Sequence, residues 1–243
     1  MNRIAVISDI HGNVPALEAV LDDIHYRRIE KIICLGDLVG KGPQSHDAIA
    51  MVKKHCEITV KGNWDDFITK DPEFETLKWH QNQLTDEDRR YLTKLPFSAE
   101  LTMSGRLIRL FHASPYSIYT RIQPWDSIER RMSMFEDTEM TGKSSKRPDV
   151  AGYGDVHQAF VYQYKEKMLF NTGSVGNPLD MTQASYAVLE GLEGEEAEGP
   201  FSIQLIRVPY DIERSIRIAR EADMPDLKEY IQELTTAKYR GLS

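Results

Sequence analysis

The chain has 243 residues, of which 41% are hydrophobic and 28% are charged, and its formal net charge at pH 7 is −8. These values are typical of a globular protein with one substantial core, and we expect a single domain over residues 1–243. The acidic balance argues against general nucleic-acid binding, which requires a cationic surface. No apolar run is long enough for a signal-peptide core or a bilayer span, and only two cysteines are present. We therefore expect a cytoplasmic protein without a membrane partner.

Strand and helix patterns alternate in the first sixty residues. Short apolar runs rich in β-branched residues predict buried strands, and the segments between them show helical spacing of apolar residues. Asn13 is a plausible cap of the first helix, with Pro15 in its first turn. This βαβαβ order predicts parallel strands joined by right-handed crossovers. The expected strands cover residues 3–8, 31–36 and 56–62, and the expected helices cover 13–28 and 43–55.

The remainder of the chain predicts further strands and outer helices. Residues 72–96 predict two polar helices that form a cap inserted in the domain, and a polar loop follows with a helix near 124–137. An acidic loop is expected at 191–200, and two helices beginning at Asp211 and Pro225 close the chain. The fold class is therefore α/β with mixed sheets. The other expected strands cover 97–103, 106–112, 148–152, 159–165, 167–173, 184–191 and 201–209.

Polar side chains with ligand-type atoms follow the ends of five predicted strands. In open α/β sheets, ligands bind beyond the carboxyl ends of the strands. A buried carboxylate or imidazole at such a place requires a partner, because its burial is otherwise costly. We therefore expect these side chains to converge on one polar site. They are Asp9, His11, Asp37, Asn63, His112, Asp155 and His157.

This set combines four oxygen-donor side chains with three imidazoles and contains no thiolate. Such a mixture suits Mn²⁺, Fe or Zn²⁺ better than Ca²⁺. Seven donors exceed what one ion takes, but with Asp37 as a bridge they fit two ions of about four protein ligands each. Each short motif alone has an ordinary alternative as a helix cap, a turn or a structural histidine. Only the occurrence of all these motifs together, in this order along the chain, favours a metal centre.

Six motifs of this chain resemble the serial signature of calcineurin-like metallophosphoesterases, in family order. The subgroup that they resemble comprises small bacterial phosphodiesterases and symmetrical diadenosine-tetraphosphate hydrolases. The resemblance implies a four-layer α/β/β/α sandwich with two mixed sheets and a dinuclear metal site at the strand ends. The motifs are SDIHGN (8–13), GDLVGKGP (36–43), KGNWD (61–65), FHASP (111–115), GDVH (154–157) and NTGSVGNP (171–178).

The resemblance also implies a ligand for each position of the two-ion site. Residues 154–157 stand where the family usually has Gly-His-x-His, so Asp155 replaces a histidine. A carboxylate there favours a harder metal such as Mn²⁺ or Fe, with Zn²⁺ also possible. Alternatively, Asp155 turns away and the second ion is bound weakly. Asn171 and Ser174 would support the ligands from the glycine-rich turn. By motif, Asp9, His11 and His157 hold one ion, Asp37 bridges, and Asn63, His112 and Asp155 hold the second ion.

The same resemblance implies a mechanism. The ions would share a bridging water and lower its pKa, so that hydroxide attacks phosphorus in line. Asp37, Asn63 and His112 would then be the catalytic residues. Many relatives carry a general-acid histidine where this chain has Trp64, and an indole N–H is not acidic. Asp65 is retained, and the resemblance implies that this carboxylate orients the histidine in the relatives that have one. We therefore expect leaving groups that need little protonation, with Trp64 either stacking on a ring or covering the cleft.

The identity of the substrate is open at this stage. We expect a small phosphorylated molecule, which is a phosphodiester, a phosphomonoester or a dinucleoside polyphosphate. Lys41, Trp64 and Tyr116 are candidate substrate contacts, and a surface role is open for each. One alternative is a non-catalytic protein of this fold that binds a protein partner; a nuclease is less favoured by the acidic balance. Further candidates for anion or ring contacts are Tyr119, Arg121, Arg130 and Arg131.

Overall fold

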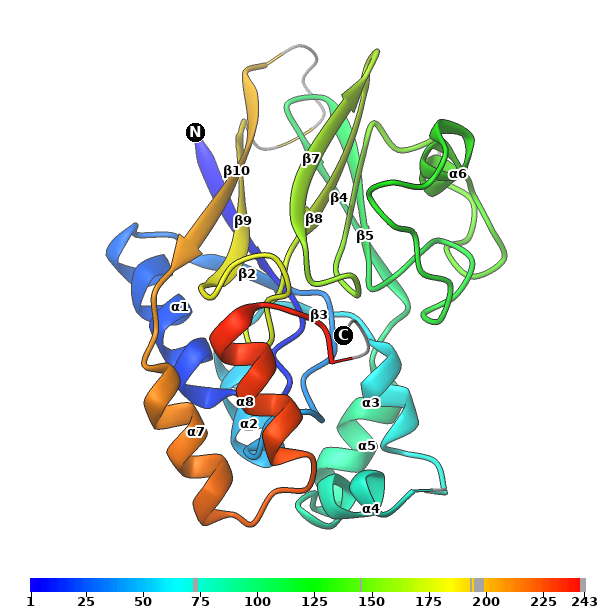
Figure 1. Ribbon diagram of the computed structural model, residues 1–243. Helices are drawn as coiled ribbons and strands as arrows, with labels where there is room; N and C mark the ends of the chain where they lie inside the picture. Colours follow the sequence, from blue (N-terminus) through cyan, green and yellow to red (C-terminus); the bar gives the residue numbers. More distant parts are fainter. Residues whose placement is uncertain (72–73, 145, 193, 195–198, 241–243) are drawn as a thin grey trace.

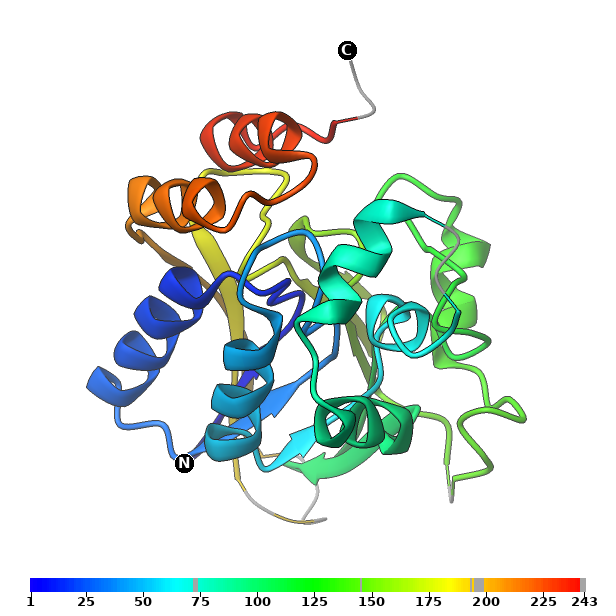
Figure 2. The ribbon, with the colours of Figure 1, turned by 90° about the horizontal axis from the view of Figure 1, so that it is seen from below.

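The computed structural model describes residues 1–71, 74–144, 146–192, 194 and 199–240. Within these residues the strands form two five-stranded sheets, and each sheet contains parallel and antiparallel pairs. The sheets stack against each other with helices on the outside, as Figure 1 and the view from below in Figure 2 show. The predicted α/β class with two mixed sheets is therefore confirmed.

The first sheet has the strand order β10-β9-β1-β2-β3. Strands β1, β2 and β3 are parallel, so the predicted βαβαβ order is confirmed. The third strand is shorter than the expected run at 56–62, because the chain leaves the sheet to begin a helix at Asn63. The strands are β1 Asn2–Ile7, β2 Lys31–Cys34, β3 Ile58–Thr59, β9 Ala184–Gly191 and β10 Phe201–Val208.

The second sheet has the strand order β4-β5-β6-β8-β7. Its three central strands are parallel, and the two edge strands pair antiparallel with their neighbours. The strands expected at 97–103 and 106–112 are present as β4 and β5, which form a hairpin around residue 104. The strands are β4 Ser98–Met103, β5 Arg106–Phe111, β6 Val150–Tyr153, β7 Ala159–Tyr164 and β8 Lys167–Thr172.

Helices cover the outer face of the first sheet. The first helix begins as expected, because the Asn13 side chain accepts a hydrogen bond from Ala16 N and a proline stands in the first turn. The free cysteines Cys34 and Cys56 pack in this helix-covered layer. Within the described residues no helix is long and apolar enough to cross a bilayer. The helices are α1 Val14–Tyr26, α2 Ser45–His55, α3 Asn63–Phe67, α4 Glu75–Asn82, α5 Asp86–Lys94, α6 Ile128–Met132, η1 Ser133–Phe135 (a 3₁₀ helix), α7 Ile212–Glu221 and α8 Leu227–Thr236.

The expected cap region, residues 72–96, contains α4 and α5 as predicted, although residues 72–73 lie outside the described part of the chain. The Thr85 side chain accepts from Asp88 N at the start of α5 and forms a capping box there. Leu92 is buried in the same apolar cluster as α1 and α2. The helices of this region are thus anchored in the main core. The acidic loop expected at 191–200 falls largely outside the described residues.

The helix expected near 124–137 is shorter than predicted. Only α6 and η1 are helical, and residues 124–127 form a turn. The Asp126 carboxylate accepts a hydrogen bond from Gln123 N at 2.8 Å, and the Ser127 hydroxyl accepts from Arg130 N at 3.3 Å. These two side-chain contacts fix the turn and start the helix only after Ser127. Figure 1 shows α6 on the outer side of the second sheet.

Apolar side chains from both sheets fill the layer between them. Val6 and Ile33 come from the first sheet, and Ile108, Leu110 and Phe170 come from the second. All five side chains have no exposed surface. The buried residues of β1 and β2 are apolar on both faces because helices cover the opposite face of these strands, as expected for central parallel strands. This shared core fixes the position of one sheet relative to the other.

The carboxyl ends of parallel strands from both sheets meet at one edge of the sandwich. His112, directly after β5, has its Nδ1 2.8 Å from Leu35 O, directly after β2. The Gly154 N–H after β6 donates to His112 O at 2.9 Å. In Figure 1 this edge faces down, toward α3 and α8. The loops that leave these strands therefore lie together, although they are far apart in the sequence.

Replacing Leu110 with alanine tests the importance of this shared core. The Leu110 side chain is fully buried between the sheets, and Leu→Ala changes at such positions cost about 2–5 kcal/mol in the free energy of unfolding. Urea denaturation followed by circular dichroism measures the cost. The matched control is Val161→Ala, because Val161 is 40% exposed on edge strand β7. Equal stabilities for the two variants would contradict the proposed packing.

Candidate metal centre

All seven candidate metal ligands lie at the shared edge of the two sheets. Each side chain is at most 8% exposed. Four of them come from loops or a helix start that follow strands of the first sheet, and three follow strands of the second sheet. The convergence expected from the sequence is therefore present. After the first sheet come Asp9 and His11 (β1), Asp37 (β2) and Asn63 (β3); after the second come His112 (β5), Asp155 and His157 (β6).

Five of the seven candidate ligands have left-handed backbone conformations. Non-glycine residues adopt this region rarely, at a cost of about 1–3 kcal/mol each. These residues lie in the segments that directly follow β1, β2 and β6, where their side chains come together at the strand ends. Strain of this kind, concentrated at one place, is typical of functional sites. The φ angles are 56° for Asp9, 49° for His11, 53° for Asp37, 60° for Asp155 and 58° for His157.

The three histidines share one hydrogen-bonding pattern. In each ring Nδ1 contacts a backbone carbonyl oxygen, which can only accept a hydrogen bond. Nδ1 therefore carries a proton, and Nε2 faces the centre, where its deprotonated form can bind a metal ion. The ring with its proton on Nδ1 is the tautomer that metal binding through Nε2 requires. The contacts are His11 Nδ1 to Val39 O (3.0 Å), His112 Nδ1 to Leu35 O (2.8 Å) and His157 Nδ1 to Asn177 O (2.5 Å).

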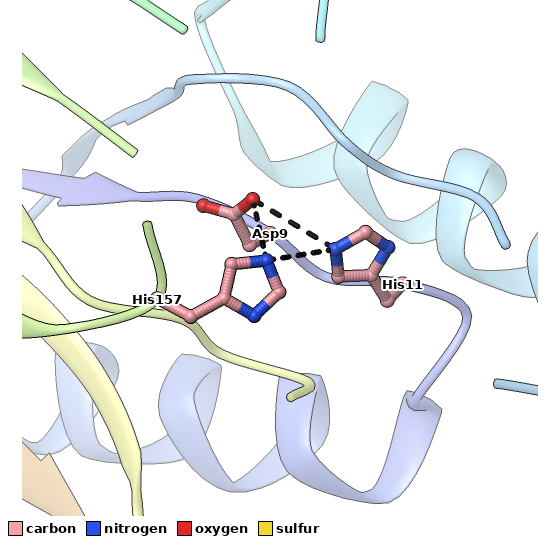
Figure 3. Close-up of side chains that lie close together, drawn as sticks. All are labelled: Asp9, His11 and His157. Atoms are coloured by element: carbon pink, nitrogen blue, oxygen red, sulfur yellow. Dashed lines mark hydrogen bonds and ion pairs between the residues drawn. The ribbon is translucent and has the colours of Figure 1, made fainter. Parts of the chain in front are cut away.

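Asp9, His11 and His157 form the first cluster, which Figure 3 shows. His157 Nε2 lies 3.2 Å from Asp9 Oδ1 and 3.2 Å from His11 Nε2, and His11 Nε2 lies 3.8 Å from Asp9 Oδ1. Two ligands about 2.0–2.2 Å from one ion lie about 3–3.5 Å apart. Asp9 Oδ1 is buried and has no hydrogen-bond partner among the described residues. Three lone-pair atoms that face one another in this way fit a bound cation.

Asp9, Asp37 and His112 form the second cluster. His112 Nε2 lies 3.4 Å from Asp37 Oδ1 and is also buried without a hydrogen-bond partner in the described structure. The other oxygen of the same carboxylate, Asp37 Oδ2, lies 3.6 Å from His11 Nε2. Asp37 therefore faces both clusters, as a bridging ligand must, and Asp9 belongs to both. The buried carboxylates and imidazoles are thus compatible with a dinuclear site.

Asp155 and Asn63 are beside the second cluster, but their contacts differ from those of the other five. Asn63 Nδ2 donates to Asp155 Oδ1 at 2.9 Å, and Arg121 donates to both oxygens of the same carboxylate. Asp155 Oδ1 is 4.0 Å from His112 Nε2. Its backbone N–H donates to Asp9 Oδ2 at 3.1 Å, which joins the two sheets at the centre. The metal-binding role of Asp155 remains a prediction.

Burial and neighbouring charges shift the pKa values of the site residues in opposite directions. Burial alone would lower the pKa of His112, but Asp37 and the other carboxylates raise it to about 10. Burial would likewise raise the pKa of Asp9, yet the neighbouring imidazoles, with His157 foremost, hold that pKa below its usual range. Burial raises the pKa of Asp37 instead, but an ionised Asp9 carboxylate that is fully buried creates a strongly negative potential. A cation within the site would neutralise that potential.

Hydrogen bonds from neighbouring residues hold the loops that carry the candidate ligands. The Asn171 side chain donates to Gly154 O, and the Ser174 hydroxyl donates to Asp9 O at 2.8 Å, so both support ligand-bearing turns. Asn177, whose carbonyl accepts from His157, was not among the residues expected from the sequence. A backbone acceptor has no residue-type signature that could have indicated it. Gly154 is required because a Cβ there would lie 2.5 Å from Asp9 Oδ2.

Asp65 has a different role from the one that the resemblance suggests. In relatives this carboxylate orients a general-acid histidine, but in this chain Trp64 stands at that place. Instead Asp65 Oδ2 accepts from Asp37 N and from Gly62 N, and Oδ1 accepts from Leu38 N, all at 2.9 Å. The carboxylate is fully buried. It therefore holds the turn that carries Asp37 against the start of α3.

The three predicted substrate contacts lie in different surroundings. Lys41 Nζ donates to Asn177 Oδ1 at 2.9 Å, beside His157. Trp64 contacts the His11 ring edge-on, with ring centroids 5.9 Å apart, and its N–H backbone group donates to Asp37 Oδ1. Both residues therefore border the centre. Tyr116 is 41% exposed, and its hydroxyl donates to the carboxylate of Glu136, directly after η1, and not to a candidate metal ligand.

Of the further anion and ring candidates, only Arg121 contacts a predicted ligand. Arg130 is exposed and donates to Arg121 O at 3.0 Å. Arg131 stacks over the Tyr162 ring on the outer side of the second sheet, 4.3 Å from its centroid. Tyr119 bonds to Asp66 at the end of α3. Arg121 is thus the arginine that the fold brings to the centre.

Comparison with known proteins identifies the family. Residues 2–194 match the family model described as the calcineurin-like phosphoesterase superfamily domain. The chain belongs to this superfamily. The matched region contains all seven candidate ligands and ends before β10, α7 and α8.

Individual relatives agree with this assignment. Uncharacterized protein MJ0912 of Methanocaldococcus jannaschii is 32% identical over 229 residues, which cover 88% of this chain and 90% of that protein. Phosphodiesterase YfcE of Escherichia coli is 24% identical over 206 residues, 78% of this chain and 88% of YfcE. The metallophosphoesterase from Sphaerobacter thermophilus aligns with a TM-score of 0.78 and 25% identity over 97% of this chain and 99% of that one. The resemblance inferred from the motifs is confirmed.

Replacing Asp65 with asparagine tests its role as an acceptor. An amide supplies one acceptor oxygen where the carboxylate supplies two, so at least one of the three N–H groups loses its partner. Each buried N–H without an acceptor costs about 1–3 kcal/mol. The adjacent Asp66→Asn is a matched control, because Asp66 pairs with Lys70 near the surface, where such pairs contribute about 0–1 kcal/mol. Chemical denaturation should show the larger loss for Asp65→Asn, and the reverse order would contradict this role.

Proposed function

We propose that the protein is a dinuclear-metal-dependent phosphoesterase that hydrolyses a small phosphorylated substrate, which is a phosphodiester, a phosphomonoester or a dinucleoside polyphosphate. The observation that carries this proposal is the pair of buried clusters in which Nε2 atoms and carboxylate oxygens face one another. Family membership and the similarity to a protein named as a phosphodiesterase support it. The alternative of a non-catalytic scaffold is less well supported, because a donor residue is retained at every ligand position.

The donor set indicates which residues would hold the metals and which metals fit. Asp9, His11 and His157 would hold one ion, and Asp37 would face both ions. His112 would hold the second ion, with Asn63 and Asp155 beside it. Oxygen donors and imidazoles without thiolates favour Mn²⁺ or Fe, with Zn²⁺ also possible. When bound, two such ions activate water and neutralise charge on phosphoryl oxygens.

The residues of the chain itself position the substrate and limit the chemistry. The Trp64 ring borders the His11 side of the centre and excludes water from it. Lys41 contributes a positive charge on the same side, because its Nζ is fixed to Asn177 beside His157. A phosphoryl group at the clusters would therefore lie between this ammonium group and the guanidinium of Arg121. Both cations match the charge of a phosphate ester.

Among the described residues, the histidine that contacts Trp64 without being a candidate metal ligand is His80, and it is not a general acid at neutral pH. His80 contacts the Trp64 ring edge-on, with centroids 6.3 Å apart, but it is buried. Burial, together with the charge of Arg240, lowers the pKa of His80 to about 4. The imidazole is therefore neutral at pH 7. Esters whose leaving groups depart as stable anions, such as nitrophenolates, nucleotides and pyrophosphate-type groups, should consequently be the better substrates.

Hydrolysis of bis-p-nitrophenyl phosphate tests the proposed function. We expect the protein supplied with Mn²⁺ to cleave this diester, chelation to abolish cleavage, and Asp37→Asn to reduce the rate by about 100-fold or more, since even supporting residues of metal ligands contribute about 10–100-fold. Asp22→Asn is the control, because Asp22 is exposed on α1. Released nitrophenolate is measured by absorbance. Equal rates for Asp37→Asn and the unchanged protein would contradict the proposed function.

A further inference from the structure

Arg121 forms a two-pronged ion pair with Asp155, the residue that stands in place of the family histidine. Arg121 Nε donates to Asp155 Oδ2 at 2.9 Å, and Arg121 Nη2 donates to Asp155 Oδ1 at 2.9 Å. The carboxylate side chain is 3% exposed, whereas the arginine side chain is 50% exposed. Paired N–H donors on a carboxylate are among the stronger contacts that a protein makes. A cation supplied by the chain therefore already neutralises this buried carboxylate.

The hydrogen bonds to Asp155 leave it little capacity to bind a metal. A carboxylate has about four lone-pair positions, two on each oxygen. Oδ1 accepts from both Asn63 Nδ2 and Arg121 Nη2, so both of its positions are in use. Oδ2 accepts from Arg121 Nε. An ion bound through Oδ1 must consequently displace one of these donors, and a guanidinium close to a divalent ion is also repelled by it.

The two sides of the centre differ in whether a cationic side chain is bonded to a candidate ligand, and in the spacing of their donor atoms. In the first cluster no lysine or arginine of the described residues bonds to any of the three donor atoms, and two of the three donor pairs are 3.2 Å apart. On the second side, His112 Nε2 is 3.4 Å from Asp37 Oδ1 but 4.0 Å from Asp155 Oδ1. The first side therefore has the spacing of ligands around one ion, while Asp155 must shift to reach that spacing.

The segment around Arg121 lets its side chain move without moving the backbone. The backbone is anchored, because Arg121 O accepts from Arg130 Nη2 and Ile122 O accepts from Tyr153 Oη at 2.6 Å. Tyr153 and Ile122 are buried in the core of the second sheet. The guanidinium lies at the half-exposed mouth of the site. It can leave Asp155 for solvent through side-chain rotation alone.

We propose that Arg121 competes with the second metal ion for Asp155, so that the two ions bind in two steps of different affinity. The inference rests on the two-ion centre of the proposed function. The first ion would bind at Asp9, His11 and His157 without displacing a lysine or arginine from these ligands, because Lys41 is bonded to Asn177 instead. The second ion binds more weakly, because it must displace the guanidinium from Asp155. Arg121 is thus a positioning residue that sets metal occupancy through Asp155.

Metal titration of Arg121 variants tests this inference. Mn²⁺ is titrated into the chelator-stripped full chain by calorimetry, and electron paramagnetic resonance follows the spin-coupled Mn²⁺ pair. In Arg121→Met, which keeps length but removes charge and donors, we expect the second step to tighten by about tenfold to a hundredfold, since bonds to a charged group contribute about 1.5–3 kcal/mol. The first step should change by less than about twofold, because its ligands are not bonded to Arg121. The coupled signal should appear at lower Mn²⁺ concentration.

Two further variants complete the experiment. Arg121→Lys keeps the charge but not the paired donors, so its second step should lie between those of the unchanged protein and Arg121→Met. Arg217→Met removes an exposed arginine of α7 and should leave both steps unchanged. A second step that is unchanged or weaker in Arg121→Met, with Arg121→Lys agreeing, would overturn the inference. One common affinity for both ions in the unchanged protein would overturn it while leaving the two-ion centre intact, and no bound metal in any variant would overturn both.

Discussion

The architecture of the site depends on one electrostatic constraint, which is that buried lone-pair donors cannot face one another without a positive charge among them. Asp9 Oδ1, His11 Nε2 and His157 Nε2 meet in the interior, and the histidine protons are already committed to backbone carbonyls on the other side of each ring. Burying an unpaired carboxylate costs several kcal/mol. A metal ion bound among these three side chains would offset this cost.

The two sheets are needed together because neither carries a complete ligand set. The first sheet supplies Asp9, His11 and Asp37, while His112 and His157 come from the second sheet. The apolar layer between the sheets therefore sets the separation of the donors. Left-handed turns after the strands then direct the side chains inward, and the backbone strain at these turns is supported by hydrogen bonds such as those to the carboxylate of Asp65. Stability of the core and geometry of the site are thus coupled.

Much of this site could be predicted from the sequence because each ligand directly follows an apolar strand. Asp9 and His112 are examples: the strand pattern gives their place in the fold, and the motif order gives their partners. The role of Asp65 could not be carried over from the family. The family role is to orient a histidine, and Trp64 stands in place of that histidine in this chain. Its position at the third residue of α3 was the available signal, since a carboxylate there accepts from N–H groups of the first turn.

Contacts made by loops without periodic structure were beyond sequence reasoning. Arg121 lies in a polar segment where several arginines and tyrosines were equally good candidates, and only the fold shows that this arginine reaches Asp155. The length of the helix near α6 was overestimated for a related reason. The Asp126 and Ser127 side chains form local hydrogen bonds that compete with helix formation. The resulting site is asymmetric, because Arg121 is bonded to Asp155 on one side, whereas no lysine or arginine of the described residues is bonded to the donor atoms of Asp9, His11 and His157 on the other.

Anomalous diffraction from crystals grown with Mn²⁺ tests the central claim most directly. The account predicts two anomalous peaks about 3.5–4 Å apart, one among Asp9, His11 and His157 and the other beside His112, with Asp37 between them. Peaks only at the surface of the molecule, or none within this group of side chains, would contradict it.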